Sequence, residues 1–154
     1  MPYHLAQINI GRLIAPMDDP RIEGFVSQLA PVNALADAAP GFVWRLQSAS
    51  GNAMDIAYSE DPTINVNMSV WESVEALRAF TYQAEHLEQL RQRAQWFEKS
   101  DLPIYCLWWV PAGRIPTVAE GRERLEHYRR HGPTPHAFWF QHLFPAPAEE
   151  AVSV

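Results

Sequence analysis

Two segments of the chain alternate between hydrophobic and polar residues with the period of two that is typical of β-strands with unlike faces. The first is Tyr3 to Ile10, and the second is Ile64 to Trp71, where asparagine, serine and tryptophan alternate with aliphatic residues. Phe42 to Leu46 and Ile104 to Val110 are rich in aromatic and branched residues, which favour strands. The pattern therefore predicts four strands.

Helical spacing separates these strands. Asp18-Asp19-Pro20 offers capping carboxylates and a proline suited to a first helical turn, and apolar residues follow at helical spacing. We expect this helix to kink at Pro31 and to end at Ala38-Ala39-Pro40-Gly41. After the third strand, the pattern predicts two short helices, Ser73 to Phe80 and Ala84 to Phe97.

The last third of the chain predicts one more helix. Thr117 and Glu120 have the spacing of a capping box, and a charged helix is expected from Val118 to Arg130. Ala137 to Phe140 reads as a short edge strand, and Ser48 to Pro62, rich in Ser, Gly, Asn and Asp, as a loop.

The order strand, helix, strand, strand, helix, strand predicts an α+β protein with a ferredoxin-like βαββαβ antiparallel sheet and an extra C-terminal helix. With 154 residues, we expect a single domain over residues 1–144 and a flexible tail over 145–154. In such a fold the helices cover one face of the sheet.

The other face then needs a cover. The aliphatic row of residues 64–71 is the natural partner of the helices, which places Asn65, Asn67 and Trp71 on the opposite face. Apolar residues of the fourth strand also belong there, so we expect two sheets to face each other in a homodimer. A ligand cavity is expected within or beside that barrel.

Composition and charge narrow the classes of function that the chain can have. A formal charge of -6 without a dense basic cluster argues against a nucleic-acid surface. The chain shows no secretory signal, and its longest apolar run is far below the roughly 20 residues of a membrane-spanning helix. Cys106 is the single cysteine, which fits a reducing compartment, so we expect a cytoplasmic protein.

Several motifs together resemble the DUF3291 family of uncharacterised bacterial proteins, over nearly the whole chain. They are Asn65 to Leu77, His86 with Arg93, Leu107 to Gly113, and His131 to Pro135. The resemblance implies the architecture of the dimeric α/β-barrel superfamily, which includes antibiotic-biosynthesis monooxygenases, haem-binding enzymes and isomerases.

His86 and Arg93 are the first candidates for catalysis. They lie seven residues apart, so on a helix they share a face and are separated by roughly 10 Å. His86 suits a general base, a hydrogen-bond donor or an axial haem ligand, and Arg93 suits a carboxylate or an enolate oxygen. The alternative is structural, with His86 packed against a loop and Arg93 paired with a glutamate.

Neutral amides are the second group of candidates. Asn65, Asn67, and Gln7 or Asn9 are suited to donating hydrogen bonds to a developing oxyanion. Cross-strand pairing is the ordinary alternative for such residues. Tryptophans are suited to stacking on a flat ligand, although core packing is their common role; the candidates are Trp44, Trp71, Trp96 and Trp109.

No metal site is expected, because the histidines lack a compact spacing with a carboxylate, although His127 and His131 lie four residues apart. The resemblance to the dimeric α/β-barrel superfamily implies a cofactor-independent, monooxygenase-like enzyme or an isomerase/cyclase, and we expect it to act on an aromatic or polyketide-like molecule. His86, Arg93 and Asn65 are its predicted catalytic residues, and Asn9, Asn67 and the tryptophans bind the substrate. The alternative is a non-catalytic protein that binds a hydrophobic ligand such as haem.

Overall fold

The computed structural model describes residues 2–16, 18–48, 56–85 and 95–147. Two predicted catalytic residues, His86 and Arg93, lie outside the described residues, as do most of the predicted second helix after the third strand and the end of the predicted tail.

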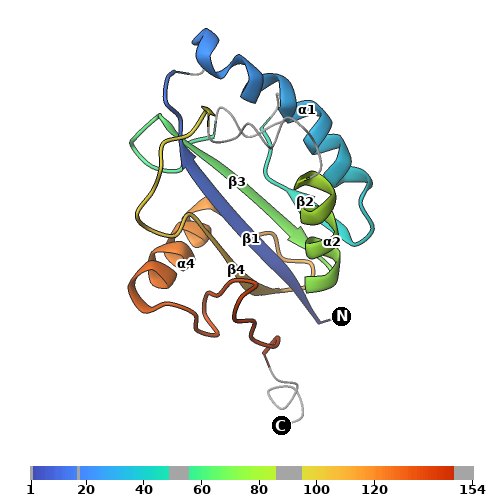
Figure 1. The fold of residues 1–154 in the computed structure, drawn as a ribbon. Helices are drawn as coiled ribbons and strands as arrows, with labels where there is room; N and C mark the ends of the chain where they lie inside the picture. Colours follow the sequence, from blue (N-terminus) through green and yellow to red (C-terminus); the bar gives the residue numbers. More distant parts are fainter. Residues whose placement is uncertain (1, 17, 49–55, 86–94, 148–154) are drawn as a thin grey trace.

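Four strands form one antiparallel sheet in the order β2-β3-β1-β4 (Figure 1). This order and the connecting helices are those of a ferredoxin-like fold, so the predicted α+β class is confirmed. The elements are β1 (Tyr3–Arg12), a 3₁₀ turn (Pro20–Ile22), α1 (Glu23–Ala38), β2 (Phe42–Arg45), β3 (Ile64–Trp71), α2 (Val74–Glu85), β4 (Tyr105–Pro111) and α4 (Val118–His131).

Local sequence signals explain where the elements begin and end. Asp19 accepts a hydrogen bond from the Arg21 backbone and caps the 3₁₀ turn. Helix α1 continues through Pro31 and is followed by Gly41, whose φ of +82° suits glycine. A Cβ at Gly41 would lie 2.5 Å from the Cβ of Ala76, so this turn also brings α1 and α2 close together.

Helices α1 and α2 lie on one side of the sheet and α4 lies on the other (Figure 1). The aliphatic row of β3 packs under α4, which contributes Leu125, and not under α1 and α2 as its pattern suggested. Ile8 and Cys106 on the neighbouring strands belong to the same cluster. Val66, Met68 and Val70 are each only 1% exposed.

The polar row of the sheet therefore faces α1 and α2, which corrects the expected orientation. The face opposite α1 and α2, which was expected to need a second copy as its cover, is the aliphatic one, and α4 and Tyr58 of the same chain cover it. The homodimer stays a prediction, but burial of that face does not require it.

Two further boundaries differ from those predicted. Helix α2 runs without a break to Glu85, and Phe97 lies in an extended bridge with Leu13 and not in a helix. The segment predicted as an edge strand is joined to β4 by one isolated bridge, in which Leu107 and Phe138 exchange backbone hydrogen bonds of 2.7 and 3.0 Å. In the described part of the chain, no helix has the length and apolar character needed to cross a membrane.

Candidate functional site

A cavity of about 560 Å³ lies between the polar face of the sheet and helices α1 and α2. Strands β1 and β3 form its floor, the two helices form its roof, and a segment after α4 that includes Trp139 and Phe140 closes it on the β4 side. The volume is in the usual range for small-molecule sites. The cavity lies within a single chain.

The floor is a hydrogen-bonded row of side chains from paired strands. Gln7 Nε2 donates to Asn67 Oδ1 (2.7 Å) and to Ser69 Oγ (2.8 Å). Asn9 Nδ2 donates to Gln7 Oε1 and to Asn67 Oδ1, both at 3.1 Å. The indole Nε1 of Trp71 donates to Ser69 Oγ (2.8 Å). These bonds hold the floor rigid before any ligand arrives.

The hydrogen bonds within the floor leave several donors for a ligand. Asn67 Oδ1 and Ser69 Oγ each accept two hydrogen bonds, which fills their capacity as acceptors. The two protons on Gln7 Nε2 and the two on Asn9 Nδ2 are committed within the row. The Ser69 hydroxyl proton and the Asn67 amide protons remain to be donated, so the floor suits a ligand oxygen that carries negative charge.

Aromatic rings form much of the wall. Phe80 of α2 stacks on Trp71 with ring centroids 4.9 Å apart. Tyr105 stacks on Trp139 at 3.9 Å. Phe97 reaches the cavity over Gly11, where a Cβ would lie 2.4 Å from the ring. A flat ligand would find ring faces around it and polar groups beneath it.

Few titratable groups line the described part of the cavity. Arg45 and Tyr105 are the only lining residues of that part with titratable side chains. Arg45 Nε donates to Asp37 Oδ1 at 2.8 Å, which offsets its charge. No described carboxylate, histidine or thiol borders the cavity.

The cavity brings together four of the predicted site residues, Asn9, Asn65, Asn67 and Trp71. The other predicted tryptophans lie elsewhere. Trp44 packs in the cluster under α4, and Trp96 is buried against Gly24, Phe25 and Leu13. Trp109 donates from Nε1 to the Phe144 carbonyl (2.9 Å) and does not line the cavity.

Sequence reasoning missed the polar residues that the helices contribute. Gln28 and Asn33 of α1 and Thr81 of α2 line the cavity. Gln28 lies three residues after Phe25 and four before Val32, and both of these residues also line the cavity. A glutamine on an otherwise apolar helix face is a sequence signal from which a polar site could have been predicted. Trp139 and Phe140 were not recoverable in this way, because their placement depends on a long-range bridge.

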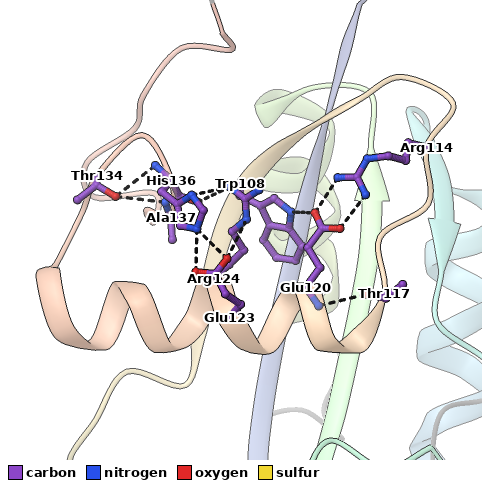
Figure 2. Close-up of polar contacts among 9 residues, drawn as sticks. All are labelled: Trp108, Arg114, Thr117, Glu120, Glu123, Arg124, Thr134, His136 and Ala137. Carbon is purple, nitrogen blue, oxygen red and sulfur yellow. Dashed lines mark hydrogen bonds and ion pairs between the residues drawn. The ribbon is translucent and has the colours of Figure 1, made fainter.

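A second polar network, on the opposite face of the sheet, anchors α4 (Figure 2). Glu120 accepts from Trp108 Nε1 (2.9 Å) and from both terminal nitrogens of Arg114 (2.8 Å each). Thr117 Oγ1 accepts from the Glu120 backbone, which confirms the cap. The arginine hydrogen bonds are the main cause that lowers the pKa of Glu120, and the Trp108 bond adds to them.

The other end of α4 holds the segment that leads to the cavity wall. Arg124 Nη1 donates to the His136 carbonyl (3.0 Å), and His136 Nε2 lies 2.8 Å from Glu123 (Figure 2). The ring centroid of His127 lies 4.4 Å from that of His131 and 4.5 Å from that of His136. In the described part of the chain, however, no three histidine, cysteine or acidic residues are placed to hold a metal ion.

Comparison with protein families decides the identity of the chain. The sequence matches the family described as a domain of unknown function, DUF3291, over residues 4–154. The chain belongs to the DUF3291 family. A comparison with curated proteins gives no match for this DUF3291 protein.

Two solved structures are similar to the DUF3291 chain in fold. One is a mutant of SnoaB, a cofactor-independent oxygenase from Streptomyces nogalater, with 14% identity and a TM-score of 0.45. The other is a protein of unknown function from Nitrosomonas europaea, with 14% identity and a TM-score of 0.44. Each match covers 75% of this chain and 97% of the other.

Proposed function

We propose that the protein is a small-molecule enzyme that converts an aromatic or polyketide-like ketone or phenol through its enolate, without a cofactor. The observation that supports this most directly is the cavity floor, where Ser69 and Asn67 have donors left for an oxyanion, beside a wall that includes the rings of Phe80 and Tyr105. Oxyanion stabilisation by fixed donors is usually a large contribution to such catalysis.

The proton transfer is assigned to His86 in this proposal. Ala84, at the end of α2, lines the cavity, and His86 follows it by two residues in the sequence. His86 removes a proton next to the substrate carbonyl; the electron pair of the broken C–H bond forms a carbon–carbon double bond, and the π electrons of the carbonyl move onto its oxygen. Arg93 and Asn65 join the floor donors in stabilising that oxygen.

The enolate then has three outcomes. Reprotonation at another carbon completes an isomerisation, and attack of the enolate carbon on a second carbonyl of the substrate, followed by protonation of the new alkoxide, completes a cyclisation. Reaction with dioxygen instead gives a hydroperoxide that loses water, so that one oxygen atom stays in the product as a new carbonyl and the other leaves as water. A homodimer and a cytoplasmic location are part of the same proposal.

Enolate formation is tested by proton exchange. The purified protein is incubated in D₂O with 1-tetralone, and the loss of the α-proton signal is followed by NMR while an electrode records oxygen uptake. We expect exchange above the buffer rate, and a reduction of about 10²-fold or more in His86→Ala, since general bases contribute about 10²–10⁴-fold. His131→Ala, an exposed histidine on α4, is the matched control and should exchange like the wild type.

Equal exchange by wild type and His86→Ala, with both folded by circular dichroism, would remove the assignment of the base. Binding of 1-tetralone without exchange or oxygen uptake would instead favour a non-catalytic binding protein, and a Soret band on haem titration that is lost in His86→Ala would identify haem as its ligand.

A further inference from the structure

Gln28 is a buried amide in the cavity wall with an unpaired acceptor. Its side chain lies on α1, the residue is 5% exposed, and it lines the cavity. Within the part of the chain that the structure describes, its Oε1 has no hydrogen-bond partner. Buried polar atoms are nearly always paired, and leaving one unpaired destabilises the fold, so an unpaired acceptor at a cavity wall points to a ligand.

The cavity-lining residues nearest to Gln28 in the sequence cannot pair with its oxygen through their side chains. Phe25 and Leu29 border the cavity beside it and provide no polar side-chain atom. The floor on the sheet side offers donors to a ligand, because the Ser69 hydroxyl proton and the Asn67 amide protons are not used within the row. The cavity therefore has donors on the sheet side and the unpaired Gln28 acceptor on the α1 side.

We infer that Gln28 is a specificity-determining residue, which selects ligands with a hydroxyl or N–H donor on the side that faces α1. The same ligand carries its acceptor oxygen on the side that faces the sheet. This inference rests on the proposed function and narrows its substrate class to hydroxylated aromatic ketones and similar molecules. A ligand without the donor leaves Gln28 Oε1 buried and unpaired in the complex.

The test is a comparison of two probes that differ by one hydroxyl group, 6-hydroxy-1-tetralone and 1-tetralone. Their dissociation constants are measured by calorimetry, at a pH below the pKa of the phenol, for wild type, Gln28→Met and Leu29→Met. We expect the wild type to prefer the hydroxylated probe by about tenfold, the value of one buried hydrogen bond. Gln28→Met, which keeps the length of the side chain, should lose that preference.

Leu29→Met is the matched control, because it changes the next cavity-lining residue without altering any hydrogen-bonding group. It should keep the preference of the wild type. A preference that is unchanged in Gln28→Met, or failure of both probes to bind the wild type, would overturn the inference.

Stability without ligand is an independent readout. An unpaired buried oxygen destabilises the folded protein, and Gln28→Met removes that oxygen. Gln28→Met should therefore have a melting temperature at least as high as that of Leu29→Met. A clearly lower melting temperature for Gln28→Met would show that the amide has a partner within the protein and would also overturn the inference. The binding data do not depend on catalysis. A selective preference without proton exchange would support the role of Gln28 while the proposed enzyme activity failed.

Discussion

Ser69→Ala removes the acceptor that fixes the floor of the cavity. Ser69 Oγ accepts from Trp71 Nε1 and from Gln7 Nε2, each at 2.8 Å. Trp71 is 0% exposed and Gln7 is 6% exposed, so both donors are buried when the hydroxyl is removed. The substitution therefore leaves two buried N–H groups unpaired.

The expected cost follows from those two groups. An unpaired buried donor costs about 1–3 kcal/mol. The second amide proton of Gln7 keeps its hydrogen bond to Asn67, which restrains the side chain. The unpaired Gln7 donor is therefore expected to cost about 1 kcal/mol, the lower end of that range. We therefore expect Ser69→Ala to lower the free energy of unfolding by about 2–4 kcal/mol.

Equilibrium urea unfolding measures this change, and a double-mutant cycle with Trp71→Phe assigns it. Phenylalanine has no N–H, so Ser69→Ala should cost about 1–2 kcal/mol less in the Trp71→Phe background. Ser27→Ala, an exposed serine on α1, is the control and should change stability by less than about 0.5 kcal/mol. If Ser69→Ala costs no more than this control, or costs the same in both backgrounds, the hydrogen-bonded floor is not as described.

Two further predictions follow from the structure, one for each face of the sheet. Glu120→Gln should destabilise the protein by about 1–2 kcal/mol at neutral pH, since hydrogen bonds to charged groups contribute about 1.5–3 kcal/mol and Gln keeps part of them. The pKa of Glu120 is lowered from 4.5, mainly by Arg114, so the charge stabilises the fold above that value and the benefit is lost as the pH falls through the lowered pKa. Urea unfolding from pH 7 to pH 3 should show the two proteins converging, whereas a constant gap would contradict the assignment. Gly11→Ala should displace the Phe97 ring and cost about 1–3 kcal/mol by overpacking, and Phe97→Ala should relieve that cost in the double variant.

The sequence pattern was sufficient to locate the strands and the helix caps. β3 has its predicted bounds, Ile64–Trp71, because strict alternation of polar and apolar residues marks both ends of a strand. Helix α4 begins at Val118, as the Thr117 cap predicted. These signals are local, so they can be read without knowledge of the partner elements.

Alternation identifies the two faces of a strand but not the element that covers each face. The pattern assigns the aliphatic row to α1 and α2, because alternation within β3 carries no sign that α4 covers a sheet face. The same limit applies to the tryptophans. Trp44 and Trp71 are the same residue type on neighbouring strands, and only the strand pairing places Trp71 in the cavity and Trp44 under α4.

The position of α4 explains why a polar row lies inside this fold. An aliphatic sheet face needs a close, dry cover, and α4 supplies one, because Gly121 allows the helix to approach Ile8 and Met68 so closely that a Cβ would lie 2.8 Å from the Ile8 side chain. With that face sealed within one chain, α1 and α2 do not need to pack tightly against the sheet. The space they leave over Asn67 and Ser69 is the cavity, and its polar floor is stable because the side chains hydrogen-bond to one another. The candidate site is thus a consequence of how the apolar face is covered.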